Sequence, residues 1–305
     1  MTLAADPAVG GFSLDEANEL AHAQVAHVAA ENGIRVLSIK GLVADRYRLR
    51  VPRVAADADV WVDPARRDDL CELLALRGWH VRREREVPSL TGQHSVTLIR
   101  DDWPNDIDAH HRFPGFFATD ASVFERLWQS REQMIIANTT VAVPSRGASA
   151  VIAALHAVRY SKSERHSLEL RDVVERLRDD FSSQERTEFF DVARVGCAQW
   201  VLRDLYDQLG ERWQTDADEH QRRVWQLNRE TVEDGATVSW LDAVRSAPLA
   251  RKPAVILRAA WISRADIPRN DPDRLPTRRE AWQHRALRWR RGFAALLRYA
   301  RVTLR

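Results

Sequence analysis

The feature that most constrains the fold is the stretch 35–63, which reads RVLSIKGLVADRYRLRVPRVAADADVWVD. Its apolar runs predict strands at 34–39 and 57–62, with a turn and a helix-like segment between them. Side chains alternate between the two faces of a strand, so Asp57 and Asp59 point the same way. At a rise of about 3.3 Å per residue, their Cα atoms are roughly 6.5 Å apart. Two carboxylates at that spacing can converge on a divalent cation, so this strand predicts an active site.

A strand, a glycine-containing turn, a helix and an Asp-x-Asp strand, in this order, resemble nucleotidyltransferases of the DNA polymerase β type. The combination is similar to an uncharacterised bacterial nucleotidyltransferase family, in which Lys-Gly replaces the Gly-Ser of better-known members. Residues 105–110 resemble that family's later strand, with a single Asp and a nearby His, and weaker similarity continues at 155–156 and 168–172. The matching residues of the first block are Lys40, Gly41, Arg53, Asp57, Ala58, Asp59 and Val62.

The resemblance implies an enzyme that moves an NMP group from an NTP to an acceptor and releases pyrophosphate. Two Mg²⁺ ions, with Mn²⁺ as an alternative, would stabilise the attacking and leaving oxygens, and Mg²⁺ prefers carboxylate and phosphate ligands. Asp57 and Asp59 are two predicted ligands. The third is expected from a strand at 105–111, where Asp106 and Asp108 share a face. The resemblance favours Asp108, with Asp106 as the alternative.

Lys40 and Gly41 stand where a strand turns into a helix, and they are the predicted triphosphate contacts. Glycine lets the backbone approach a phosphate closely, and a helix N-terminus presents free N–H groups. Arg53 is a further predicted phosphate contact. An ordinary turn with a surface lysine, and a plain surface arginine, are the alternatives. The turn is not a P-loop, because it lacks the second glycine and the following Ser or Thr.

The predicted fold class is α+β: a mixed β-sheet with helices on one face, followed by a mainly α-helical C-terminal half. We expect a catalytic domain over 1–145 and a helical domain over 146–305. Ser13 and Glu16 predict a capping box for the first helix, and Asp63 with Pro64 predicts the start of another. Further strands are expected near 79–84, 94–100, 105–111 and 139–143, and helices at 122–129, 147–161, 166–179, 182–195, 197–212, 217–234, 252–264 and 278–301.

Whole-chain composition says little about partners, because the 305 residues carry a formal net charge of +2. Cys71 and Cys197 lack zinc-site spacing and read as reduced thiols of a cytoplasmic protein. The N-terminus lacks a secretory pattern, and no apolar run approaches the ~18 residues of a membrane span. The expected partners are an NTP and an unidentified acceptor. Neither the nucleobase nor the oligomeric state can be deduced.

Several polar residues near these motifs favour structural roles. His110 and His111 are interpreted as packing residues, since imidazole is a poor ligand for Mg²⁺. Asp172 matches a position of the family, but a solvated or capping aspartate is the simpler interpretation.

The last helix, 278–305, contains nine arginines and one glutamate, whereas the rest of the chain is acidic overall. Its apolar residues recur at three- and four-residue spacing, which predicts a packed apolar stripe with solvated arginines opposite. Binding of RNA, DNA or an anionic acceptor is the alternative. The stripe comprises Trp282, Ala286, Trp289, Phe293, Leu296 and Ala300.

Two other functions compete with the enzyme. The first is a non-catalytic binding or antitoxin-like module that keeps the nucleotidyltransferase fold, against which three intact aspartates argue. The second is a nucleic-acid-binding protein that works through the arginine-rich C-terminal helix. Salt-dependent binding that survives loss of Asp57 would distinguish it from the enzyme.

Overall fold

The computed structural model divides the chain into two compact units, each of which is treated by itself. The first unit holds the sheet and also helices that follow residue 145, so it extends beyond the expected catalytic domain. The boundary expected at residue 145 stays a prediction about which parts fold alone. The units are Met1–Arg82 with Gln93–Gln221, and Arg83–Gly92 with Arg222–Arg305. The structure describes residues 11–82, 94–160, 163–231, 240, 244, 247–261 and 277–303.

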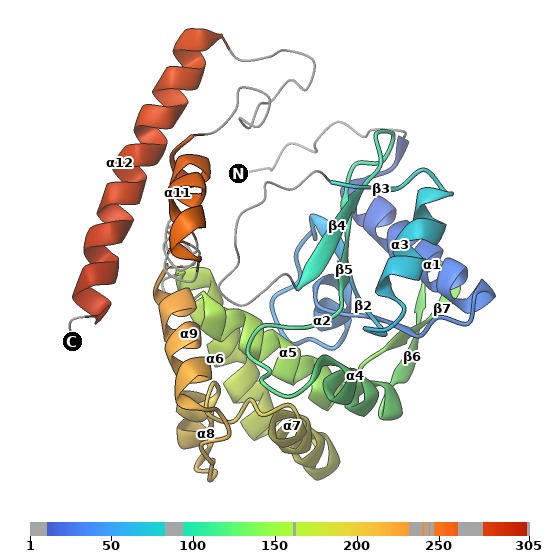
Figure 1. The fold of residues 1–305 in the computed structure, drawn as a ribbon. Coiled ribbons are helices and arrows are strands. Elements are labelled where there is room, and N and C mark those ends of the chain that lie inside the picture. The colour runs from blue at the N-terminus through green and yellow to red at the C-terminus, as the bar shows by residue number, and fades with distance from the viewer. Residues whose placement is uncertain are drawn as a thin grey trace, which may run out of the picture. The chain divides into compact units, whose positions relative to one another are not determined.

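Helices and strands mix in the first half of the chain, and helices follow (Figure 1), which confirms the predicted fold class. The strands are β1 (Val36–Ser38), β2 (Asp57–Val62), β3 (His80–Val81), β4 (Ser95–Ile99), β5 (Asp106–His110), β6 (Glu132–Ile136) and β7 (Thr139–Val143). The helices are α1 (Leu14–Glu31), α2 (Gly41–Arg46), α3 (Arg67–Ala75), α4 (Asp120–Gln129), α5 (Arg146–Arg159), α6 (Glu164–Asp179), α7 (Ser183–Val195), α8 (Arg203–Leu209), α9 (Glu219–Thr231), α11 (Lys252–Ala260) and α12 (Arg278–Thr303). In the described part of the chain, none of them has the length and apolar character that a membrane span requires.

The main sheet has five strands in the order β1-β2-β5-β4-β3. β2 and β5 run parallel, whereas the other neighbouring pairs are antiparallel, so the sheet is mixed as predicted. β6 and β7 form a separate antiparallel hairpin, which contacts α1. The parallel pair lies in the middle of the sheet, where both of its strands have neighbours on each side.

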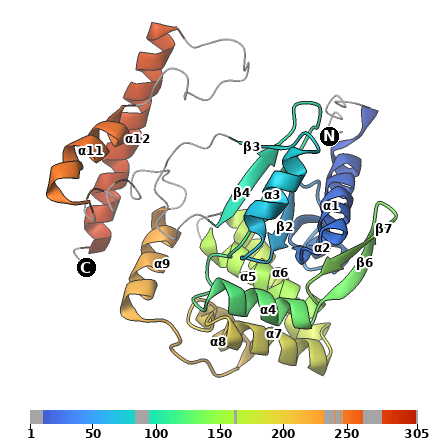
Figure 2. The ribbon, with the colours of Figure 1, turned by 45° about the vertical axis from the view of Figure 1, so that its right-hand side comes forward.

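One face of the sheet is apolar and packs against α1 and α3, which lie side by side (Figures 1 and 2). Fully buried residues of β2 and β5 supply this face, and each alternates with a polar or aromatic residue that points the other way. Burying this face also holds the opposite face in place. The core residues are Ala58, Val60, Val62, Ile107 and Ala109 from the strands, Ala21, Val25 and Val28 from α1, and Leu70 and Leu74 from α3.

The predicted start of α1 is confirmed. The Ser13 N–H donates to the Glu16 carboxylate (2.8 Å), and the Glu16 N–H donates to the Ser13 hydroxyl (3.3 Å). This capping box satisfies N–H groups that would otherwise lack partners in the first turn. The cap helps to fix where the helix that covers the sheet begins.

The opposite face of β2 and β5 carries carboxylates and is bordered by the helical part of the first unit. Its apolar member, Trp61, is fully buried and stacks on Phe113 with ring centroids 5.9 Å apart. α5 packs on α2, α6 and α7, and it appears beside α6 in Figure 1. α1 and α3 cover the other face of the sheet. The cavities described below therefore lie on the carboxylate face, next to α5 and α6.

Three local predictions were wrong. Asp63 does not cap a helix that begins at Pro64, because its carboxylate accepts from Arg35 (2.7 Å) and from the Ala65 N–H (3.1 Å), and α3 begins at Arg67. The helix expected at 197–212 is shortened to α8, Arg203–Leu209. No strand was expected at 132–136, where β6 lies.

In the second unit, α12 contacts α11 through an unexpected face. Arg285 is only 6% exposed, and its guanidinium lies 3.9 Å from the centre of the Trp261 ring. By contrast, Trp282 and Phe293 of the predicted apolar stripe are 52% and 70% exposed. The expectation of a buried stripe with solvated arginines is therefore wrong for these residues. Stacking on indole lets a guanidinium be buried while it keeps its charge.

Candidate active site

The register of the parallel β2–β5 pair brings the predicted carboxylates together. Asp57 lies opposite Asp106, and Asp59 lies opposite Asp108. Because partners in register point to the same face, all four carboxylates stand on the side of the sheet away from α1 and α3. His110, two residues beyond Asp108, shares that face. One strand pair thus assembles an acidic group over a buried apolar base.

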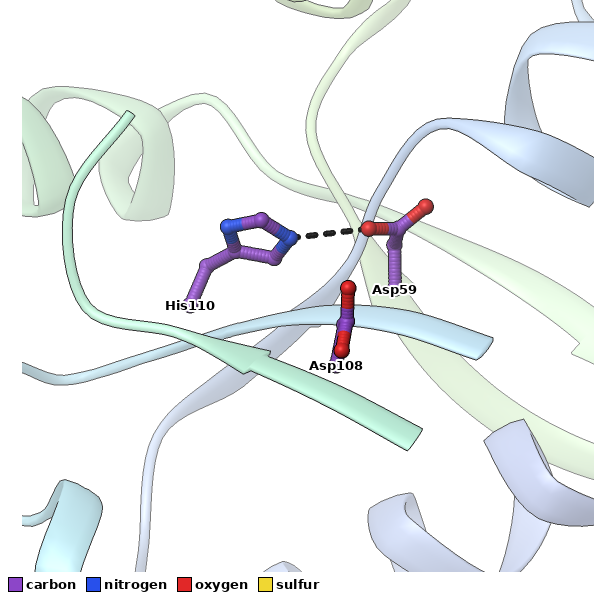
Figure 3. A group of neighbouring side chains, drawn as sticks. All are labelled: Asp59, Asp108 and His110. Atoms are coloured by element: carbon purple, nitrogen blue, oxygen red, sulfur yellow. Dashed lines mark hydrogen bonds and ion pairs between the residues drawn. The ribbon is translucent and has the colours of Figure 1, made fainter. Parts of the chain in front are cut away.

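Asp59, Asp108 and His110 form the centre of this group (Figure 3), and one ligand atom of each lies within 4.8 Å of the others. The His110 Nε2–H donates to Asp59 Oδ1 over 2.8 Å. Lys40 Nζ donates to the same oxygen over 2.5 Å and lies 3.2 Å from His110 Nε2. A lysine ammonium therefore stands beside the carboxylate that a divalent cation would use.

The pKa values of the two carboxylates of β2 are shifted in opposite directions. Burial opposes ionisation of Asp59, but the charge of Lys40 and the hydrogen bond from His110 outweigh it and lower the pKa of Asp59. Burial and the charges of Asp59 and Asp108 raise the pKa of Asp57 to about 6. Among the described residues, no hydrogen bond or ion pair reaches the Asp57 carboxylate. Asp57 is therefore the carboxylate that most needs a cation.

The two candidates for the third carboxylate differ in their partners. Asp106 is paired with Arg82, with 2.5 Å between Nη2 and Oδ2. Asp108 instead accepts a hydrogen bond of 2.6 Å from the Thr97 hydroxyl and forms no ion pair with any residue that the structure describes. A neutral hydroxyl orients a carboxylate without neutralising it. The geometry therefore agrees with the preference for Asp108, whose role stays a prediction.

Lys40 and Gly41 form a strained turn at the start of α2. Lys40 has φ 53° and ψ −143°, and Gly41 has φ 25°, both in the region that side chains disfavour. A Cβ at Gly41 would lie 3.3 Å from the Cβ of Ala55. This backbone aims the Lys40 side chain back at Asp59. Since α2 has only six residues, the charge of Lys40 matters more here than the helix dipole.

A cavity of about 330 Å³ opens beside this turn. Its lining joins Lys40, Gly41 and Arg53 to Asp57 and Asp59, so the structure brings these predicted site residues to one space. Sequence reasoning did not single out the other guanidinium groups in the lining, those of Arg50 and Arg165, or the carboxylate of Glu169.

The charged groups of this cavity are mostly paired with one another. Arg53 lies 3.3 Å from Glu169, and Arg165 lies 3.8 Å from the same carboxylate. Arg50 donates to Asp45 over 2.6 Å. Burial and the charge of Arg50 lower the pKa of Arg53. An anionic ligand beside Arg53 would oppose both effects.

A second cavity of about 180 Å³ also has Asp57 in its lining. Lys40, Asp57 and His156 line both cavities, so the two spaces meet at the acidic group. Asp108 and His110 line only the smaller one. The remaining described lining is His94, Phe113, Pro114, Arg159 and Tyr160.

Other polar residues that the sequence highlighted lie elsewhere. The Arg67 guanidinium donates to His111 Nδ1 over 3.1 Å, so this imidazole is not part of the acidic group. Asp172 is on α6 and lines neither cavity. His110 was interpreted as a packing residue, but the structure places it against Asp59. Its position two residues after Asp108 was the available signal.

These donors fit a divalent cation. The Asp57 carboxylate is half-buried and without a partner among the described residues, and one ligand atom each of Asp59, Asp108 and His110 lies within 4.8 Å of the others. Carboxylate oxygens suit Mg²⁺ and Mn²⁺, and an imidazole nitrogen favours the second of these ions. The arrangement can hold a cation next to a cavity lined with arginines, which suits a phosphorylated substrate.

Residues 15–206 match the model of a family described as uncharacterised nucleotidyltransferase. The chain belongs to this family. The match confirms the family resemblance that the sequence indicated and the predicted enzyme class, nucleotidyltransferase. The matched range includes the residues that form the acidic group and line both cavities.

Three solved structures resemble the fold. The antibiotic-resistance factor ANT(2'')-Ia is 18% identical, with 64% of this chain and 95% of that chain covered and a TM-score of 0.39. A nucleotidyltransferase-like protein from Paracoccidioides brasiliensis is 12% identical, with coverage of 67% and 97% and a TM-score of 0.37. A tRNA nucleotidyltransferase with a primer tRNA and an ATP analogue is 15% identical, with coverage of 77% and 74% and a TM-score of 0.28. No curated protein matches the chain.

Proposed function

We propose that this family member moves an NMP group from an NTP to a hydroxyl group of an acceptor and releases pyrophosphate. The observation that supports this best is the register that sets Asp59 opposite Asp108, with Asp57 beside them where two cavities meet. A transfer reaction needs two substrates at one charged centre. Two adjoining cavities offer that arrangement.

In this proposal Asp57, Asp59 and Asp108 hold Mg²⁺, with two ions bound and Mn²⁺ as the alternative. A bound divalent cation supplies positive charge to the phosphate oxygens that become more negative during transfer. Lys40 supplies a positive charge to Asp59, so its ammonium and a cation compete for one carboxylate. Thr97 holds Asp108 by its hydrogen bond, which keeps that side chain facing the smaller cavity.

The triphosphate is assigned to the larger cavity. Lys40 and Gly41 lie at its edge next to Asp59, and Arg53 faces the same space. The two further guanidinium groups, those of Arg50 and Arg165, add charge to the lining. Its volume of about 330 Å³ lies within the ~300–1,000 Å³ range of small-molecule sites.

The transfer step is a displacement at the α-phosphorus atom. The acceptor oxygen forms a bond to that atom, and the bond from it to the oxygen that bridges to the β-phosphate breaks. Pyrophosphate leaves with the electron pair. Asp108 accepts the proton of the acceptor hydroxyl and passes it to solvent.

We also place the protein in the cytoplasm, where NTPs are available. The half-buried thiols of Cys71 and Cys197 are both free, which is the usual state in a reducing compartment.

The test is NTP turnover by the purified full chain. Each of the four NTPs, labelled at the α-phosphate, is incubated with a metabolite extract and either Mg²⁺ or EDTA. The proposal expects Mg²⁺-dependent release of pyrophosphate and transfer of the label to an acceptor. A folded protein that binds no NTP by calorimetry in the presence of Mg²⁺ would contradict the proposal.

A further inference from the structure

The smaller cavity contains a guanidinium group that forms no ion pair with the described residues. Arg159, the last residue of α5, lines this cavity together with Lys40, Asp57 and Asp108. Within the described ranges, Arg159 forms no ion pair, and its buried Nε has no hydrogen-bond partner. Its guanidinium lies 5.5 Å from the centre of the Tyr160 ring. A half-buried charge of this kind is costly unless a ligand pairs with it.

The larger cavity provides the contrast. There Arg50, Arg53 and Arg165 each have a carboxylate partner. Of the four arginines in the described linings of the two cavities, Arg159 alone has no carboxylate partner among the described residues. The carboxylates that line the smaller cavity, Asp57 and Asp108, are those that the proposed function gives to the metal.

The rest of the described lining is neutral or aromatic. Burial lowers the pKa of His156 to about 3, so its imidazole is neutral at physiological pH. Phe113 and Tyr160 add ring surfaces, and Tyr160 also adds a hydroxyl. These groups can hydrogen-bond or pack against a ligand. They carry no negative charge that would bind a polycationic ligand.

We propose that the smaller cavity is the acceptor site, and that the acceptor is a small hydroxyl compound with a phosphate or carboxylate group. Arg159 binds that anion, and the hydroxyl group points at Asp108. The volume of about 180 Å³ is little more than half that of the larger cavity, about 330 Å³, which suits a small metabolite. This inference rests on the proposed function for the reaction, but the anion site can be tested by binding alone.

This proposal gives each end of the acceptor a place during the transfer step. Its oxyanion stays on Arg159, unchanged by the reaction. Its hydroxyl oxygen bonds to the α-phosphorus atom, its proton goes to Asp108, and pyrophosphate leaves with the electrons of the broken bond. Arg159 is thus a binding residue for the acceptor and takes no part in bond making.

The test is calorimetric binding of glycerol 3-phosphate to the full chain, with Mg²⁺ and a non-hydrolysable ATP analogue present to fill the larger cavity. Arg159→Gln should weaken glycerol 3-phosphate binding at least tenfold and change binding of the analogue less than twofold. Arg165→Gln is the matched control, since it removes a guanidinium from the other cavity and should weaken only the analogue. Circular dichroism confirms that both variants fold. Equal binding of glycerol 3-phosphate by Arg159→Gln and wild type overturns the proposal.

A second set of ligands separates the sources of the anion. Glycerate and glycerol 3-phosphate should both bind at least tenfold more tightly than glycerol, and the tighter of the two identifies carboxylate or phosphate as the preferred group. Tobramycin, a polycationic amino sugar, should not compete. If glycerol or tobramycin binds as tightly as the anions, the proposal is wrong. Turnover of NTP is scored separately: its absence contradicts the proposed reaction, whereas binding that depends on Arg159 still supports the anion site.

Discussion

Asp59 and Asp108 lie opposite each other on neighbouring parallel strands, and His110 donates to Asp59 from two residues further along β5. The group therefore depends on the pairing of two strands rather than on one contiguous motif. Because their alternate residues are buried against α1 and α3, β2 and β5 cannot slip by one residue without burying the carboxylates. The apolar core thus keeps the acidic face in register.

Lys40 should matter more for the triphosphate than for the nucleoside. Lys40→Ala is expected to weaken NTP binding about tenfold, as one charge-assisted hydrogen bond is lost, and to weaken NMP binding much less. Calorimetry with both nucleotides measures the difference. Lys252→Ala, which removes a lysine from the start of α11 in the second unit, is the control. Equal losses for NTP and NMP would show that Lys40 does not contact the β- or γ-phosphate.

Asp57→Asn should raise the melting temperature of the metal-free protein at pH 8. The pKa of Asp57 is raised from 3.8 to about 6, so ionising this group costs free energy in the folded state. That cost is absent below pH 4 and fully present above pH 6. The advantage of the variant should therefore shrink as the pH falls from 6 to 4.

Thermal unfolding in EDTA between pH 4 and pH 8 measures this advantage. Asp102→Asn serves as the control, because hydrogen bonding to Arg100 lowers the pKa of that carboxyl and should give the opposite trend. A lower melting temperature for Asp57→Asn at pH 8 would mean that Asp57 has a stabilising partner.

In the second unit, Arg285 should contribute to stability and Arg290 should not. Arg285→Gln removes a buried guanidinium from the Trp261 ring and is expected to cost about 1–2 kcal/mol. Arg290→Gln changes an exposed position of the same helix. Tryptophan fluorescence during thermal unfolding compares them. Equal melting temperatures would contradict the observed packing of α12 on α11.

The sequence predicted strand β2 at its observed bounds, because the strand combines an apolar run with the two-residue spacing of Asp57 and Asp59. It left Asp106 and Asp108 undecided, since both stand on one face of β5. The pairing of Asp106 with Arg82 distinguishes them, and it arises from the approach of a residue 24 positions away in the chain. No local pattern indicates such a contact.

Other features depended on packing that a local pattern does not show. β6 was missed because its hairpin turns at Ala137 and Asn138, with φ of 44° and 59°, instead of at the usual Asn-Gly or Asp-Gly. The sequence predicted a helix cap at Asp63, but in the structure its carboxylate accepts a hydrogen bond from Arg35. Arg159 was not singled out, because it belongs to a helix far from the carboxylates in sequence.

The central claim is that the carboxylates on the paired strands do the chemistry. The most direct test measures Mg²⁺-dependent pyrophosphate release by Asp57→Asn, Asp59→Asn and Asp108→Asn, with Asp106→Asn as the control on the same face. We expect each of the first three to lower the rate about a thousandfold, equivalent to about 4 kcal/mol, while circular dichroism stays unchanged. Asp106→Asn should stay within about threefold of wild type. Near wild-type release by Asp57→Asn or Asp59→Asn would contradict the account.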